Sequence, residues 1–391
     1  MRVNANRKVH QMKRDPFKTL LRFTIVLLVF VLVGVGVFAL CSKAVEADFA
    51  QKKQAVLQKN EEDEVAFNAK LNAMRSEGES FFETDETDTP PTQIQYWEKT
   101  IGDSLWRIED EGKTAPENVS TITASRSELM LGGLMLVNAW HPLPADFSDE
   151  ALIPIGSTSG YKIPVKDNSV TLFRPAYDAL YAALEAAAAD GLQNYIIQEG
   201  YRSNETQTSL FNDRMAKLQE KYSGDILIEQ TKKEVNYPGT SEYQTGFSFN
   251  MRLYPNPESL DFVESEQGKW MVANSWKYGI IFRFPTRDFP DATWEDKSHK
   301  TGVSVDLNLF RYVGEPHAAA MTTMGFCLEE YIEFLMAHPH ISIYEDGALK
   351  YEIFRVADTG DASFTLPVPN PARNCQASFD NMGGIVLAYS Y

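Results

Sequence analysis

The sequence predicts an α+β fold that follows a membrane anchor and a polar stalk. Helical and strand patterns are interleaved along residues 96–340, but they do not form the regular strand–helix–strand units of a doubly wound sheet. Residues 341–391 contain short apolar runs separated by Gly, Asp, Asn and Pro, a pattern typical of strands and turns. One uncharged apolar segment near the N-terminus predicts the anchor.

The N-terminal segment predicts a single uncleaved signal anchor. Residues 1–22 hold seven basic residues and one acidic residue, and the 19 residues Phe23–Cys41 carry no charge. At about 1.5 Å per residue this run nearly spans a hydrocarbon core of about 30 Å. A cleaved signal peptide has a shorter apolar core and a small-residue cleavage site, and a lipoprotein has a small residue where Leu40 stands. The basic tail predicts a cytoplasmic N-terminus and an extracytoplasmic domain of a single-pass membrane protein.

Residues 42–95 are polar and acidic and predict a stalk, with a Pro-terminated run before the domain begins. The net charge of −17 argues against a nucleic-acid partner. Of the three cysteines, Cys41 ends the apolar segment. Cys327 and Cys375 either pair or remain two small buried thiols; nothing in their spacing predicts a pair, so we interpret them as thiols.

The first half of the domain alternates strands and helices. Residues 134–139 form an apolar run that predicts a short strand, and His141 in the Pro-rich turn after it is interpreted as a loop or packing histidine. An Ala-rich stretch with one apolar stripe predicts a helix over 171–190, with Gly191 as its C-cap. A buried strand at 195–197 follows, and Ser203 is a natural N-cap for a second helix that reaches about residue 221.

The central stretch of the chain is residues 237–250. Pro238-Gly239 is a turn signal, and Phe247 and Phe249 alternate with polar residues at the period of a half-buried strand. The segments after it predict, in order, a helix at 270–279, strands at 280–285 and 301–311, a helix at 327–337, and strands at 341–344, 351–356 and 385–389.

The central stretch resembles the motif P-G-T-S-E-H-x-x-G-x-A-x-D of zinc D-alanyl-D-alanine carboxypeptidases of the VanY type. Four further segments between residues 134 and 335 match that family in the same order, including Gly-Tyr-Arg-Ser near residue 202 and Phe-Arg-Tyr-Val-Gly near residue 312. The resemblance implies a small antiparallel sheet flanked by helices, the D-Ala-D-Ala carboxypeptidase/Hedgehog-like fold, over residues 96–340. Residues 341–391 would then be a β-rich C-terminal extension.

The residues that bind zinc in the family are replaced in this chain. Tyr243 stands at the position of the first histidine, Asn250 at the aspartate, and Leu309 at the second histidine of the family's Glu-Pro-Trp-His motif. A phenol with a pKa of about 10 and a neutral amide are poor zinc ligands, and a leucine cannot bind a metal. Asp306 occupies the position of the catalytic base, with a shorter side chain. We therefore expect no cofactor, although the family uses zinc.

The resemblance also assigns a polar frame around the substrate. Arg202, Gln207 and Ser241 match family residues, and Arg202 is expected to face the substrate or, alternatively, to pair with a buried carboxylate. A relocated metal site is the other alternative, for instance with His299 brought close to Asp306. No pair of histidines has the spacing of a metal site.

Three hypotheses for the function follow. In the first, the protein is a catalytically inactive relative of the peptidoglycan-trimming enzymes and binds a cell-wall stem peptide or an envelope protein. In the second, it is an active D-alanyl-D-alanine carboxypeptidase with an atypical metal site. In the third, it is a structural or assembly protein in which the pocket is a relic.

Overall fold

The computed structural model describes residues 96–391 except 113–114 and 157–162. The expected cytoplasmic tail, anchor and stalk, residues 1–95, lie outside the described residues. Among the helices that are described, none has the length and apolar character needed to cross a membrane.

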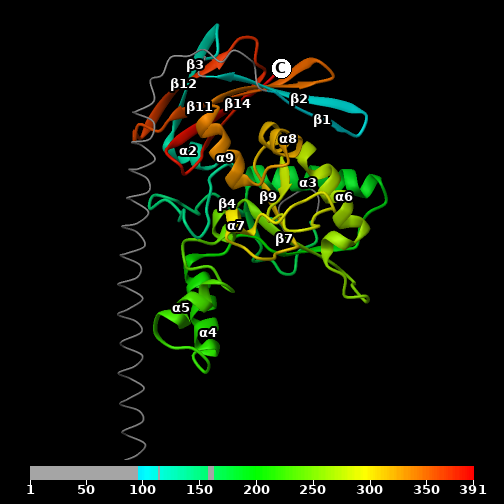
Figure 1. Ribbon diagram of the computed structural model, residues 1–391, viewed down its shortest axis with the longest axis vertical. Helices are drawn as coiled ribbons and strands as arrows, with labels where there is room; N and C mark the ends of the chain where they lie inside the picture. Colours follow the sequence, from blue (N-terminus) through cyan, green and yellow to red (C-terminus); the bar gives the residue numbers. More distant parts are fainter. Residues whose placement is uncertain (1–95, 113–114, 157–162) are drawn as a thin grey trace, which may run out of the picture. The chain divides into compact units, whose positions relative to one another are not determined.

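A four-stranded antiparallel sheet lies at the centre of the VanY-like region (Figure 1). Its strands, in their order across the sheet, are β6 (Tyr195–Glu199), β7 (Ser248–Leu253), β9 (Leu309–Tyr312) and β8 (Ile280–Phe282). Phe249 and Phe310 stand opposite each other on β7 and β9, and both rings are fully buried. The small antiparallel sheet that the resemblance implied is therefore present.

Helices flank this sheet because their apolar stripes need a partner surface. Helix α3 (Arg174–Ala189) begins with Pro175 in its first turn and buries Leu180 and Leu184 against the sheet's aromatic core. The other elements of this region are α4 (Asn204–Leu218), α5 (Gly224–Lys232), η1 (Glu242–Thr245), η2 (Phe262–Glu264), α6 (Glu266–Asn274), η3 (Ser275–Tyr278) and α7 (Ser298–Thr301). The predicted helices at 171–190, 203–221 and 270–279 overlap in sequence with α3, α4 and the α6–η3 pair, respectively.

A second sheet has six strands and joins the two ends of the described chain. Its strands, in order, are β1 (Tyr96–Ile101), β2 (Ser104–Gly112), β10 (His340–Glu345), β11 (Ala348–Ala357), β14 (Gly384–Ser390) and β13 (Asn374–Phe379). Strand β2 pairs with β10, so the segment predicted as a C-terminal extension shares one sheet with the start of the predicted domain. Helices α8 (Glu315–Met324) and α9 (Leu328–Ala337) pack on this sheet through a shared apolar core.

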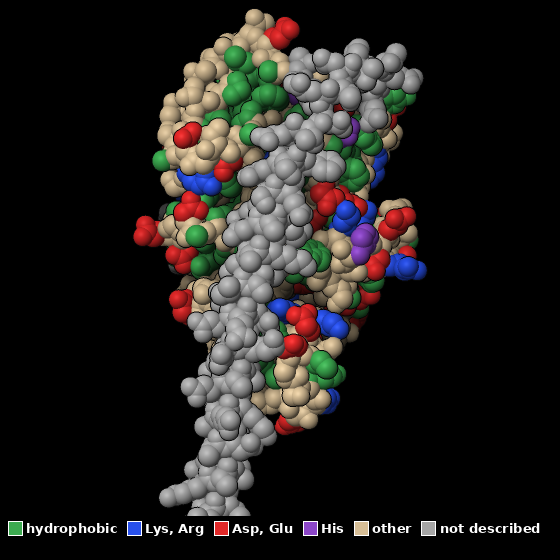
Figure 2. Space-filling model, turned by 60° about the vertical axis from the view of Figure 1, so that its left-hand side comes forward, with side chains coloured by type: hydrophobic (Ala, Val, Ile, Leu, Met, Phe, Trp, Pro, Cys, Tyr) green, Lys and Arg blue, Asp and Glu red, His purple; other side chains and the backbone are tan. Residues whose placement is uncertain are grey.

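Smaller elements cover the other face of the six-stranded sheet. They are β3 (Val119–Ser125), which pairs with β12 (Ser363–Pro369), and α2 (Arg126–Met130). A third core, which includes Phe364 and Leu387, fills the space between them. The short strands β4 (Leu152–Pro154) and β5 (Thr171–Phe173) pair separately beside α3. Figure 2 shows acidic and basic side chains interspersed over one face of the described residues.

Two predicted strands were wrong. Residues 134–137 are buried, but they form no ladder, because Leu134 N–H donates to the Ser378 hydroxyl and Leu136 N–H donates to the Asp380 carbonyl. Residues 301–308 form a helix end and a loop, and the strand begins only at Leu309. Cys327 and Cys375 are not paired, and Cys327 is the fully buried thiol of the two.

Candidate functional site

In the stretch 237–250, two consecutive turns fix the positions of the polar residues. Thr240 N–H donates to the Tyr237 carbonyl, the chain forms the single 3-10 turn η1, and Gly246 ends that turn with φ of +75°. A Cβ on Gly246 would lie 2.6 Å from ring carbons of Phe173, so the position requires glycine both for its conformation and for its space. Strand β7 follows at once. Tyr243 is thereby fixed on η1 and Asn250 on β7.

The three positions that the resemblance assigned to zinc ligands lie close together in the fold. Asn250 stands directly opposite Leu309 in the β7–β9 ladder, and opposite residues of an antiparallel pair project to the same face. The Asn250 amide Nδ2 donates to the Tyr243 hydroxyl at 3.0 Å. Leu309 is fully buried. The positions are adjacent, but their side chains supply a phenol, an amide and a hydrocarbon.

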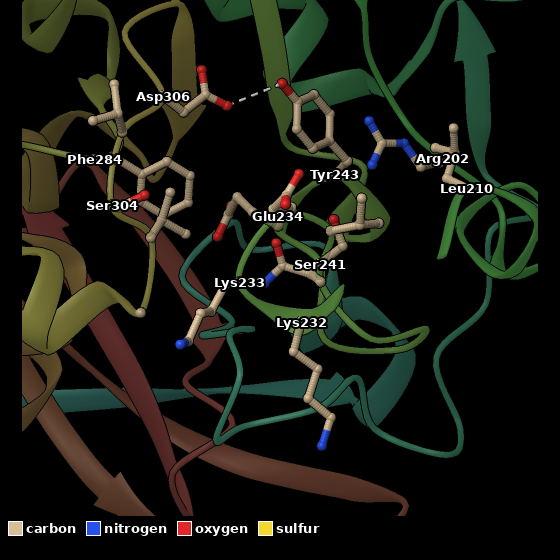
Figure 3. A pocket seen from close by; sticks show the side chains of 16 residues that line it. Arg202, Leu210, Lys232, Lys233, Glu234, Ser241, Tyr243, Phe284, Ser304 and Asp306 are labelled. Carbon is tan, nitrogen blue, oxygen red and sulfur yellow. Dashed lines mark hydrogen bonds between the residues drawn. The ribbon is translucent and has the colours of Figure 1, made fainter. Parts of the chain in front are cut away.

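Asp306 completes this cluster from the loop before β9. The Tyr243 hydroxyl donates to Asp306 Oδ2 at 3.3 Å, the interaction drawn as a dashed line in Figure 3. Burial raises the pKa of the Asp306 carboxyl, while hydrogen bonds from Asn308 N–H and the Tyr243 hydroxyl oppose that shift. Burial and the neighbouring Asp306 carboxylate raise the pKa of Tyr243 well above that of a free phenol. Tyr243 is therefore neutral at physiological pH.

Arg202 lies over the ring of Tyr243, with its guanidinium carbon 4.2 Å from the ring centroid. Its Nε and one terminal nitrogen donate to the two oxygens of Glu199 at 2.8 and 2.7 Å, and its other terminal nitrogen donates to Gln207 Oε1 at 2.7 Å. These bonds use three of the five N–H groups of a guanidinium. The side chain is 13% exposed, so Arg202 both pairs with a carboxylate and reaches the cavity surface.

Gln207 and Ser241 have different positions relative to the cavity. Gln207 is fully buried, and its Nε2 donates to the Asn236 carbonyl at 2.6 Å. Its Oε1 accepts the hydrogen bond from Arg202, and its side chain does not line the cavity. Ser241 is 2% exposed and does line it.

A cavity of about 340 Å³ lies in front of this cluster. Its walls come from Arg202, the start of η1, the segment that follows α5, and the loop 302–306. Figure 3 shows Tyr243 between Arg202 on one side and Asp306 on the other. Four of the predicted site residues therefore line one cavity: Arg202, Ser241, Tyr243 and Asp306. Asn250 and Leu309 are buried and do not line it.

A buried ion network supports the site, and sequence reasoning missed it. Glu242, next to Tyr243, receives a hydrogen bond from Arg283 at 2.8 Å and another from Arg311, and Arg283 also bonds Glu329 at 2.9 and 2.7 Å. Burial alone would raise the pKa of Glu242, but the two guanidinium groups hold it below its usual range. The available signal was two arginines inside otherwise apolar strand patterns.

The residues present do not fit a zinc ion. Zinc in proteins takes His nitrogen, Cys sulfur or carboxylate oxygen, and of the cluster only Asp306 offers one of these. The Asn250 Oδ1 atom is buried and has no hydrogen-bond partner, but a neutral amide oxygen is a weak zinc ligand. Over residues 96–391, apart from the two short gaps, no three His, Cys, Asp or Glu side chains are grouped so that they could hold a metal, and His299 joins no such group with Asp306.

Comparison with known proteins identifies the family. The model of the VanY family, described as D-alanyl-D-alanine carboxypeptidase, matches residues 170–315, which contain the four-stranded sheet and the cavity. Residues 170–315 of this chain therefore match the VanY family. The resemblance found in the sequence is thus confirmed. The match ends at Glu315, the first residue of α8, and it includes neither α9 nor any strand of the six-stranded sheet.

The chain is also similar to individual proteins of the VanY type. A D-alanyl-D-alanine carboxypeptidase of Enterococcus faecium is 28% identical over 283 residues, which cover 71% of this chain and 81% of the relative. The solved vancomycin resistance D,D-dipeptidase VanXYg, in complex with a D-Ala-D-Ala phosphinate analog, is 26% identical with a TM-score of 0.52, and the match covers 70% of this chain and 99% of that one. A vancomycin resistance D,D-pentapeptidase VanY solved in complex with Zn(II) is 27% identical over 51% of this chain and 99% of its own, with a TM-score of 0.40.

Proposed function

We propose that this protein is a membrane-anchored, extracytoplasmic member of the VanY family that binds the carboxylate end of a cell-wall stem peptide and does not hydrolyse it through zinc. Arg202 is the group that receives the carboxylate. The anchor is the uncharged segment Phe23–Cys41 that the sequence predicts.

One observation carries the loss of zinc chemistry. The three ligand positions of the family lie side by side, yet they hold Tyr243, Asn250 and Leu309. A water molecule activated by zinc needs a metal held by at least three protein ligands, and this cluster supplies one carboxylate at most.

The position and the hydrogen bonding of Arg202 support the binding role. It lines the cavity, two of its five N–H groups have no partner among the described residues, and planar guanidinium groups match carboxylates well. The similar D,D-dipeptidase VanXYg was solved in complex with a D-Ala-D-Ala phosphinate analog. A peptide that ends in D-Ala-D-Ala is accordingly the first ligand to test.

The test uses the full-length chain and the peptide diacetyl-Lys-D-Ala-D-Ala. We expect the peptide to bind, to remain intact with added Zn²⁺, and to bind at least about tenfold more weakly to the variant Arg202→Gln, because a charge-assisted hydrogen-bonded pair is lost. Arg174→Gln is the matched control, since Arg174 forms an exposed pair with Asp178 outside the cavity. Release of D-Ala that a chelator abolishes would refute the proposal in favour of an active carboxypeptidase. Absence of any binding would favour the structural or assembly hypothesis.

The anchoring is tested separately, by fractionating cells that express the chain and treating intact spheroplasts with protease. We expect the chain in the membrane fraction, with the domain digested from outside. Recovery in the soluble fraction, or protection of the domain from protease, would refute this part of the proposal.

A further inference from the structure

Tyr243 is the only residue of the described cluster that contacts Arg202, Asn250 and Asp306 together. Its ring lies under the Arg202 guanidinium, and its backbone carbonyl accepts a hydrogen bond from the backbone N–H of Arg202 at 2.9 Å. Its hydroxyl accepts from Asn250 and donates to Asp306. One side chain therefore joins the elements η1, β7 and the loop before β9.

We propose that Tyr243 is the positioning residue of the binding site, in which its ring and its hydroxyl have separable roles. The ring fixes Arg202 so that its free N–H groups face the cavity. The hydroxyl ties Asn250 and Asp306 together at the place where the family has its metal ligands. This inference rests on the proposed function, because it assigns how that function's carboxylate group is oriented.

The role of the ring follows from what else holds Arg202. Glu199 binds two of its nitrogens in one plane, but the Glu199 side chain is 36% exposed and leaves the faces of the guanidinium free. The Tyr243 ring covers one of those faces, and a guanidinium stacked on an aromatic ring is stabilised electrostatically. The remaining N–H groups are then confined to the direction of the cavity.

The role of the hydroxyl follows from burial. Asn250 is buried and Asp306 is partly buried, and among the described residues the Tyr243 hydroxyl is the only side-chain group that hydrogen-bonds to both. Removing it leaves a partly buried carboxyl and a buried amide each short of a partner, which costs stability. It leaves the ring beneath Arg202 unchanged. The two roles can thus be separated by Tyr243→Phe and Tyr243→Met, which keep and remove the ring, respectively.

The experiment measures discrimination between diacetyl-Lys-D-Ala-D-Ala and its C-terminal amide, which lacks the carboxylate. We expect Tyr243→Phe to lower the melting temperature but to keep the preference for the acid. We expect Tyr243→Met to reduce the preference for the acid over the amide by about tenfold, because a cation–aromatic contact of this kind is lost. Tyr331→Phe is the control, since it removes another buried hydroxyl, which bonds His317 at 2.9 Å outside the cavity.

A second readout needs no ligand. Rotation of the Arg202 guanidinium about its Nε–Cζ bond, followed by nitrogen-detected NMR, is expected to be slow in the wild type and in Tyr243→Phe, and at least several-fold faster in Tyr243→Met. Loss of the acid preference in the Phe variant, or an unchanged preference and rotation in the Met variant, would overturn the inference. If the wild type binds neither peptide, the proposed function fails, and the NMR comparison alone still decides the role of Tyr243.

Discussion

Replacing Glu242 by glutamine is predicted to be among the most destabilising single changes in the domain. The carboxylate is 4% exposed, lies between the fully buried Arg283 and Arg311, and also accepts from the Ser248 hydroxyl at 2.6 Å. In Glu242→Gln, two buried guanidinium groups share the single counter-charge of Glu329. Breaking a buried ion pair by removing one partner costs about 3–5 kcal/mol, a large part of the stability of an ordinary domain.

The assay is urea unfolding of the full chain at pH 7, followed by tryptophan fluorescence. Glu345→Gln is the matched control, because Glu345 pairs with Lys350 at 2.9 Å where the two side chains are 30% and 44% exposed. Exposed pairs contribute about 1 kcal/mol or less. A loss below about 1 kcal/mol for Glu242→Gln, similar to that of the control, would refute the claim that this network holds η1 to the four-stranded sheet and to α9.

The same network predicts the pH dependence of stability. The folded-state pKa of Glu242 lies below its unfolded value, because Arg311 and Arg283 outweigh the effect of burial. Its contribution is complete above an unfolded pKa of about 4.3 and is lost as the pH falls through the folded pKa. We therefore expect the difference in unfolding free energy between the wild type and Glu242→Gln to shrink as the pH falls below about 4. A constant difference would contradict this assignment.

Three further predictions follow from the geometry. The triple variant Tyr243→His, Asn250→Asp and Leu309→His is expected to bind about one zinc ion per chain with sub-micromolar affinity, measured by metal analysis and calorimetry, because the three positions already converge. Gly246→Ala is expected to cost about 2–4 kcal/mol in urea unfolding, since it combines a φ of +75° with an overlap against a buried ring. Burial lowers the pKa of His317 to about 3, so stability falls with pH below about 6.5, by up to about 1.4 kcal/mol per unit, and His317→Asn is expected to flatten this slope.

Each of these predictions has a control. For zinc, the double variant that keeps Leu309 should bind at least about a hundredfold more weakly, because it lacks the third ligand. For glycine, Gly347→Ala should cost only about 1–2 kcal/mol, since φ is +83° there but nothing lies within 4 Å of the added carbon. For His317→Asn, the slope of the unfolding free energy against pH should equal that of the wild type above pH 6.5. Equal effects in variant and control would contradict the respective prediction.

The sequence predicted the local features of the site well because they depend on short-range pattern. The turn at Pro238-Gly239 and the helix N-cap at Ser203 both appear at the predicted places. Arg202 and Tyr243, which the resemblance assigned to one site, line the same cavity.

The rest depends on contacts between distant residues, which local pattern does not encode. Residues 134–137 look like a strand because they are apolar, but their backbone groups bond to Ser378 and Asp380 from the other end of the chain. Arg283 and Arg311 were unremarkable within their motifs, and only the fold brings them to Glu242. The pairing of β2 with β10 likewise has no sequence signature.

The pairing of β2 with β10 has a consequence for the time course of synthesis. His338, just before β10, bonds Asp110 of β2 at a separation of 228 residues. At roughly 5–20 residues per second, the hairpin of β1 and β2 is complete some 10 to 45 seconds before its partner strand has been made. Throughout that interval the β2 edge is unpaired and the apolar side chains of Trp106 and Ile108 are uncovered, a state that favours association with other chains. The interval would shorten if the β1–β2 segment were moved by circular permutation to follow Tyr391.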